Sequence, residues 1–234
     1  MNYIRYIINA IVRLFFVKWR MFIPPTEQKA EDALVSYAIT VYNEETQLRR
    51  LLDFLIQHKR PNDEIVVQAD QKKVTKEVKA VVKEYKKHIN TYVEYDPDYN
   101  MAATKNHLNK HCRAPYIFQI DADEMPPEWL IDHLQEVIAA NRGIELFKLP
   151  RINIFYTKDG TQLRDWKHWP DHQGRIYKNI NERIHWWRPV HERIRGHRNY
   201  TYMPKDIKYA LIHVKPIEAT VDKWIEWKKH NMLK

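Results

Sequence analysis

The sequence predicts an α/β protein built on a mostly parallel sheet with helices on both faces. Strand-like apolar runs alternate with segments of helical spacing across residues 34–143. Such strand–helix–strand connections place neighbouring strands parallel through right-handed crossovers. At 234 residues, the chain can form one such domain with a proper core and is too short for two large ones.

The elements of this first half follow one another in a regular order. The expected strands are Leu34–Val41, Glu64–Gln68, Thr91–Tyr95 and Tyr116–Ile120. The expected helices carry Leu48 to Ile56, Val74 to His88, Ala102 to Cys112 and Leu130 to Ile138, the last opened by Pro126-Pro127. Each helix shows an apolar stripe at three- and four-residue spacing, which indicates one buried face.

Residues 1–24 form a separate segment, which we expect to be an amphipathic helix. Arg5 and Arg13 fall on one face of the helical wheel, and isoleucines line the other. The longest uncharged run, Tyr6–Val12, is far shorter than the roughly 18–20 residues of a spanning helix. The helix therefore either lies in a membrane interface or packs on protein. Residues 25–33 read as a short polar linker.

The second half differs from the first in amino-acid composition and in hydrophobic periodicity. Residues 144–216 are rich in aromatic side chains, prolines and histidines, and no long helical period appears. Short strands are expected at 146–149, 175–177 and 209–214, and this irregular part of the same domain is where an acceptor pocket would be built. Residues 217–234 return to helical spacing and predict a C-terminal helix.

Composition excludes several classes of site. Only four glycines occur, so the chain lacks glycine-rich phosphate-binding loops. A single cysteine, Cys112, cannot form a disulfide within the chain, which suits a reducing compartment. The net charge of +9 favours polyanionic surroundings such as anionic lipid or nucleic acid. We therefore expect a cytoplasmic protein, peripheral at the inner face of the membrane if its N-terminal helix binds lipid.

The fourth strand runs directly into Asp121-Ala-Asp123-Glu124. In α/β sheets the carboxyl ends of the strands form the edge where ligands bind. Two carboxylates spaced one residue apart can share a hard divalent cation, which in turn can bind a diphosphate. A solvated turn is the plain alternative for such a triplet.

Four motifs in order resemble family 2 glycosyltransferases, which have the GT-A fold. They are Thr40-Val-Tyr-Asn-Glu-Glu45, Asp63 to Asp70, the segment with Asn106, and Asp121 to Glu124. The later Gln173-Gly-Arg-Ile-Tyr177 and Val190-His-Glu192 resemble the branch that contains lipopolysaccharide-core β-glucosyltransferase relatives. The resemblance covers about residues 34–215. It implies a hexosyl- or pentosyltransferase with a nucleotide-sugar donor, a UDP-sugar being the expected one.

The resemblance also implies which residues bind the donor: Thr40, Tyr42, Asn43, Glu44, Asp70, Asn106, Asp121 and Arg175, with Lys178 as a further diphosphate contact. Asn43-Glu44 and Asp70 also suit helix caps, and both uses can hold together. Where the family often has a glycine, this chain has Asn100-Met101-Ala102, a departure on which the local backbone path depends.

Mn²⁺ or Mg²⁺ is the implied cofactor, since hard cations suit carboxylates and phosphates. Asp123 is the expected direct ligand, with Asp121 nearer the sugar or ribose, and His213 and His191 are candidate further ligands. Either histidine could instead be an ordinary polar core residue.

The resemblance implies inversion by direct displacement, which requires a base on the acceptor side, and Glu192 is the candidate. An ion pair with Arg193 or Arg195 is its structural alternative, and Asp165 and Asp171 are substitute bases. The tryptophans 166, 169, 186 and 187 suit either sugar stacking or core packing.

Three functions remain open from the sequence. The first is glycosylation of a cell-surface or lipid-linked glycan at a membrane, which accounts for the basic charge and the N-terminus together. The second has nucleic acid as acceptor, such as hydroxymethylated bases of phage DNA, and the basic–aromatic run 183–198 would suit it. The third is a non-catalytic module that binds sugar nucleotides.

Overall fold

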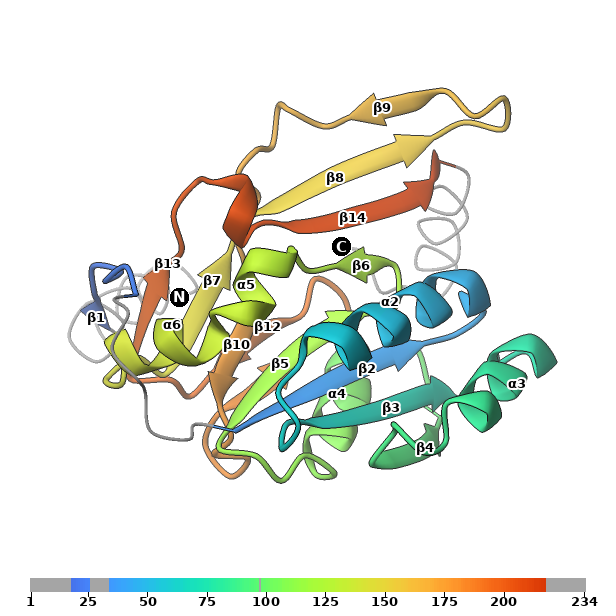
Figure 1. Ribbon diagram of the computed structural model, residues 1–234, viewed down its shortest axis with the longest axis horizontal. Helices are drawn as coiled ribbons and strands as arrows, with labels where there is room; N and C mark the ends of the chain where they lie inside the picture. The colour runs from blue at the N-terminus through green and yellow to red at the C-terminus, as the bar shows by residue number, and fades with distance from the viewer. Residues whose placement is uncertain (1–17, 26–33, 97, 218–234) are drawn as a thin grey trace, which may run out of the picture.

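The computed structural model describes residues 18–25, 34–96 and 98–217 (Figure 1). These ranges leave out residues 1–17 of the N-terminal helix expected over 1–24, nearly all of the linker, and the expected C-terminal helix from residue 218. No helix within the described ranges is both long and apolar enough to cross a membrane.

An eight-stranded sheet forms the centre of the domain. Its order is β1 (Lys18–Trp19), β13 (Asn199–Tyr202), β7 (Leu146–Leu149), β10 (Gln173–Lys178), β5 (Tyr116–Asp121), β2 (Val35–Val41), β3 (Glu64–Asp70) and β4 (Thr91–Tyr95). The four strands from β5 to β4 are parallel, whereas β10 runs antiparallel to both of its neighbours. The sheet is therefore mostly parallel, with its one reversed strand beside β5.

Helices cover both faces of this sheet. On one face lie α2 (Glu45–His58), α3 (Lys76–Glu84), α5 (Glu128–Asp132) and α6 (Leu134–Ala140). The other face packs α4 (Met101–Asn109) and a hairpin of β11 (His185–Trp187) and β12 (Arg193–Arg195). Because strand side chains alternate, Ile39 packs under α2 while Ala38 faces α4. The predicted α/β architecture is confirmed.

A second, four-stranded sheet stands beside the first (Figure 1). Its order is β6 (Glu124–Met125), β14 (Leu211–Pro216), β8 (Arg151–Tyr156) and β9 (Gln162–Arg164), with the short 3-10 helix η1 (Ile207–Tyr209) just before β14. Strand β6 follows Asp121 and Asp123 directly. The carboxylate segment is therefore the link between the two sheets.

The prediction of one helix over residues 1–24 is wrong for its described end. Lys18 N donates to Arg198 O at 3.0 Å and Arg20 N donates to Tyr200 O at 2.9 Å, so β1 pairs with β13. The edge of β13 offers backbone partners that a helix at this place could not use. Residues 18–25 are consequently strand and extended chain.

The helix expected after Pro126-Pro127 is also divided. His133 has φ −111° and ψ 15°, which is outside helical geometry, and it separates α5 from α6. Its ring stacks on Trp129 with centroids 4.4 Å apart, and its Nδ1 donates to the Trp129 carbonyl at 2.9 Å. The histidine side chain thus binds the preceding turn at the point where the helix stops.

Candidate active site

Asp121 ends β5 on the face that α4 covers. Thr40 Oγ1, on the neighbouring strand β2, donates to Asp121 Oδ1 at 2.7 Å. Arg175 Nη2 lies 3.0 Å from the other carboxylate oxygen, and Lys105 Nζ lies 3.3 Å from Oδ1. Asp121 is therefore held at the carboxyl edge of the sheet by one hydroxyl and two cations.

Arg175 joins Asp121 to Glu124, with which it forms a close ion pair. Only 3% of Arg175 and 1% of Glu124 are exposed. Although burial alone would lower it, the charges of Glu124 and Asp121 hold the pKa of Arg175 above its ordinary value. The guanidinium is thus a fixed internal cation that orders the carboxylate segment.

Arg151 extends this network into the second sheet. Its Nη1 lies 3.3 Å from Glu124 Oε1, and its Nη2 lies 2.8 Å from Asp171 Oδ2. Asn153 Nδ2 donates to the same Asp171 oxygen at 3.0 Å. Burial would raise the pKa of Asp171, yet Arg151 and its hydrogen bonds hold that pKa below its ordinary value. Asp171, a substitute base in the sequence analysis, is thus engaged in positioning Arg151.

Asp123 faces a different partner from Asp121. Its Oδ2 lies 3.0 Å from His213 Nε2, and Nδ1 of the same ring is bonded to Asn153 Oδ1 at 2.9 Å. His213 on β14 lies opposite both Glu124 on β6 and Asn153 on β8. The second sheet therefore orients the histidine so that Nε2 points at Asp123.

Glu192 follows the β11–β12 turn and meets Lys105. Its Oε1 lies 2.8 Å from Lys105 Nζ, and only 1% of Lys105 is exposed. Burial would raise the pKa of Glu192, but the Lys105 ammonium holds it below its ordinary value. The sequence offered an ion pair with Arg193 or Arg195 as the alternative to a catalytic role, and the structure pairs Glu192 with Lys105. Arg195 instead lies over the Trp187 ring.

Tyr42 directly follows β2, at the same edge of the sheet as Asp121. Its hydroxyl donates to Met101 Sδ at 3.0 Å. Its pKa is raised far above the ordinary value, first by burial and then by Asp121, with smaller contributions from Asp70, Glu44 and Glu192. The Tyr42 side chain thus lies in a negatively charged part of the site.

Glu44 closes the turn between β2 and α2. Its Oε2 accepts from Tyr42 N at 2.8 Å and from Asn43 N at 3.1 Å. Burial, joined by the charge of Asp123, raises the pKa of Glu44 even though those backbone donors lower it. Glu44 thus shapes the turn that presents Tyr42 and Asn43.

Two other residues predicted to bind the sugar nucleotide, Asp70 and Asn106, also form hydrogen bonds within the protein. Asp70 Oδ1 accepts from Lys72 N at 2.9 Å and Lys73 N at 3.0 Å, which closes the turn after β3. The Asn106 amide donates to Trp186 O and accepts from Trp186 N, both at 2.8 Å. The donor-binding roles of these residues stay predictions, and the structure adds a local use for each.

Lys178 lies at the opposite edge of the sheet from Asp121, and its assignment to the diphosphate is wrong. Because β10 is antiparallel to β5, Lys178 pairs with Tyr116 at the beginning of β5, whereas Asp121 is at its end. At about 3.3 Å per residue, five residues separate the two edges by about 17 Å. Asp165 is likewise on the outer loop after β9, bonded to His168.

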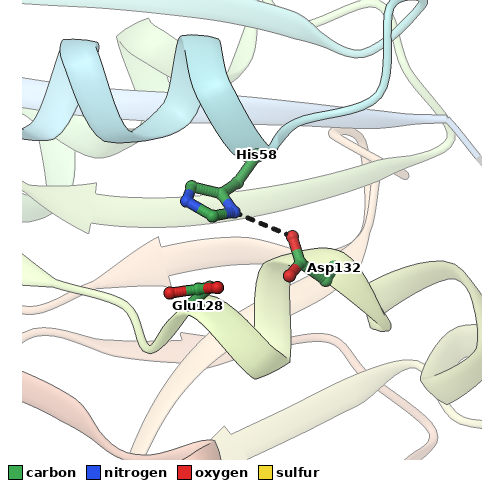
Figure 2. A group of neighbouring side chains, drawn as sticks. All are labelled: His58, Glu128 and Asp132. Carbon is green, nitrogen blue, oxygen red and sulfur yellow. Dashed lines mark hydrogen bonds and ion pairs between the residues drawn. The ribbon is translucent and has the colours of Figure 1, made fainter.

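The four expected metal ligands do not converge on one point. Within the described ranges, a group of three histidine, cysteine or acidic side chains with ligand atoms within 4.8 Å occurs at His58, Glu128 and Asp132 (Figure 2). There, His58 Nδ1 lies 3.0 Å from Asp132 Oδ1, an ion-pair contact that ties the end of α2 to α5. His191 is exposed, with φ 50°, in the turn before Glu192.

Sequence reasoning missed Lys105, Arg151 and Asn153. Lys105 had a visible signal, because it lies three residues from both Ala102 and Leu108 on the apolar stripe of α4, where a lysine needs a partner. Arg151 and Asn153 had none. They become neighbours of Glu124 and His213 only through the pairing of the second sheet.

The fold and site define an α/β protein whose ligand edge carries paired carboxylates. The family model for glycosyl transferase family 2 matches residues 36–218. The chain therefore belongs to glycosyltransferase family 2, a family of enzymes, and the expected GT-A fold is confirmed. A search of curated proteins finds no match.

The chain is similar to two solved structures, to different extents. Residues 1–349 of TarS from S. aureus, in complex with UDP-GlcNAc, superpose with a TM-score of 0.53 and 14% identity, covering 78% of this chain and 58% of TarS 1–349. The mannosyltransferase PcManGT from Pyrobaculum calidifontis, with GDP-Man and Mn²⁺, has a TM-score of 0.45 and 17% identity, over 63% of this chain and 43% of its own. The chain thus spans less than two thirds of either structure.

Proposed function

We propose that this protein transfers a sugar from a nucleoside-diphosphate sugar to an acceptor hydroxyl, with inversion at the anomeric carbon. The proposal rests on the Lys105 ammonium, which lies 3.3 Å from Asp121 Oδ1 and 2.8 Å from Glu192 Oε1. Lys105 therefore joins a carboxylate at the end of β5 to a carboxylate from the opposite half of the domain at one sheet edge. That is the arrangement a displacement between two bound substrates requires.

The side chains around Asp123 also fit a divalent cation as ligands. The carboxylates of the bonded network are Asp121, Asp123, Glu124, Asp171 and Glu192, against the cations Lys105, Arg151 and Arg175. Five negative charges thus face three permanent positive ones. His213, with Nε2 directed at Asp123, adds a nitrogen ligand of the kind Mn²⁺ accepts.

Asp123 and His213 would hold this Mn²⁺ or Mg²⁺, which would neutralise charge on the departing diphosphate. Asp121, already paired with Arg175 and Lys105, is placed to accept a hydrogen bond from the sugar or ribose. His191 remains a candidate ligand, as does Arg175 for the diphosphate oxygens. A UDP-sugar is the donor to test first.

Glu192 serves as the base in this proposal. One of its oxygens binds Lys105, and the side chain keeps 19% of its surface exposed, so an acceptor hydroxyl can reach it. The carboxylate takes the hydroxyl proton as the acceptor oxygen bonds to the anomeric carbon and the nucleoside diphosphate departs. A positioned base of this kind contributes about 10²–10⁴ in rate.

For the acceptor, we propose a lipid-linked or lipopolysaccharide-type glycan at an anionic membrane. The net charge of +9 supports this, as do the exposed apolar side chains of Trp19, Met21 and Ile23 in the described N-terminal segment. Reversing Arg5 and Arg13 to glutamate should weaken sedimentation with anionic vesicles. Unchanged sedimentation would reject the membrane part alone.

The variant Glu192→Gln tests the function. It should bind UDP-sugars with unchanged affinity and lose about 10²–10⁴ of wild-type transfer or donor hydrolysis. Donor binding would be measured by calorimetry and turnover by release of the nucleoside diphosphate, with Glu182→Gln at an exposed position before β11 as the matched control. Near-normal turnover would remove Glu192 from the reaction.

A further inference from the structure

We propose that Lys105 is the positioning residue for Glu192, fixing that carboxylate against the donor edge of the sheet. The inference rests on the proposed function of Glu192 as base. It assigns to a buried lysine of α4 the task of keeping the acceptor-side carboxylate and Asp121 in register.

The contacts of Lys105 are all directed at the site. Its Nζ lies 2.8 Å from Glu192 Oε1 and 3.3 Å from Asp121 Oδ1, and it lies 4.6 Å from the centre of the Trp186 ring. A buried ammonium is costly unless charged or hydrogen-bonded partners surround it. Two carboxylates and an aromatic face supply those partners here.

The loop that carries Glu192 needs an external support. Arg188 has φ 76° and His191 has φ 50°, left-handed conformations that cost energy in residues other than glycine. Helix α4 holds the β11–β12 hairpin, which includes this loop, at three places. Met101 N donates to Pro189 O at 2.9 Å, Asn106 binds the backbone of Trp186, and Lys105 binds the Glu192 side chain.

Of these three contacts, only the one from Lys105 reaches the reacting carboxylate itself. The other two fix backbone atoms of the hairpin. The Lys105 ammonium lies within 3.3 Å of a carboxylate oxygen of both Asp121 and Glu192, so it offsets the repulsion between these two side chains. Without it, the two carboxylates should move apart while the donor-binding strands stay in place.

The test is a double-mutant cycle in the full chain with Lys105→Met, Glu192→Gln and both together. Lys105→Met should lower kcat by about 10²-fold and change the donor KM by less than about 3-fold. In the Glu192→Gln background, the same change should lower kcat by less than about 3-fold, because the residue through which Lys105 acts is already disabled. Lys105→Arg, which keeps the charge, should recover part of the loss. Lys110→Met, at the exposed end of α4, is the matched control.

Equal losses from Lys105→Met in both backgrounds would overturn the proposal, and so would a rise in donor KM with unchanged kcat. Urea unfolding of the same variants gives a readout independent of activity. If the Lys105 and Glu192 side chains interact, the urea midpoint of the double variant should fall by less than the sum of the two single-variant shifts. Additive shifts would contradict the interaction. If wild-type protein transfers no sugar while the unfolding cycle shows coupling, the proposed function fails, the ion pair stands as a structural one, and the positioning role is rejected.

Discussion

The two halves of the domain contribute different parts of the same charge network. Residues 34–143 supply Asp121, Asp123 and Glu124 on a continuous stretch of chain after β5. Residues 144–217 supply Arg175 and His213, which bind that stretch from β10 and from the second sheet. Buried Glu124 has both of its arginine partners, Arg175 and Arg151, in the second half, so the site is a property of the junction between the halves.

The largest effect should follow from removing the internal cation at this junction. Arg175→Met leaves Glu124 buried with one of its two arginine partners lost, and we expect a loss of about 3–5 kcal/mol in the free energy of unfolding. Chemical denaturation measures it. Arg151→Met, whose side chain is more exposed, is the comparison and should cost less. Equal losses of unfolding free energy in the two variants would contradict the larger contribution expected of the more buried Arg175.

A smaller effect is expected where the second sheet orients His213. Asn153→Ala removes the bond to Nδ1 and frees the ring to turn, so Mn²⁺ affinity should fall by about 10–100-fold. Calorimetric titration with Mn²⁺ measures this. Gln162→Ala, on the exposed edge strand β9, serves as the control and should bind Mn²⁺ as the wild type does. Unchanged affinity in Asn153→Ala would remove His213 from the proposed ligand set.

The smallest effect concerns the closed interior on the α4 side. Burial, with a further contribution from Glu64, raises the pKa of Cys112 to about 12. The thiolate is the reactive form, so the folded protein should react with a disulfide reagent at pH 8 far more slowly than the unfolded chain. Because the folded pKa is raised, stability from this group is present at neutral pH and lost as pH rises above about 8.5, the ordinary thiol value. Rapid labelling of folded protein would contradict this burial.

How far the sequence predicts the molecule differs between the halves for a physical reason. In the first half, the strands and most of the helices are specified by their own apolar spacing, and β4 occupies the predicted Thr91–Tyr95. In the second half, the direction of β10 and the pairing of β14 with β6 and β8 depend on contacts far apart in the chain. Lys178 was therefore assigned to the wrong edge, while His213 could be named without its partners.

The candidate site shows the same division. Asp121 and Asp123 were identifiable because they follow a buried strand, and Glu192 because of its resemblance to the family motif. The bond from Lys105 to Glu192 joins residues 87 positions apart, and no local pattern encodes it. A lysine on the apolar stripe of α4 was the one available signal of a buried charge in need of a partner.

The role of Asp123 is tested by calorimetric titration of UDP into wild-type protein and Asp123→Ala, each with and without Mn²⁺. We expect Mn²⁺ to strengthen UDP binding to the wild type by at least about tenfold and to leave UDP binding to Asp123→Ala unaffected, since one carboxylate ligand of the ion is gone. Asp159→Ala, in the exposed turn after β8, should behave as the wild type. Equal strengthening by Mn²⁺ in wild type and Asp123→Ala would contradict the central claim that Asp123 binds the ion that binds the donor.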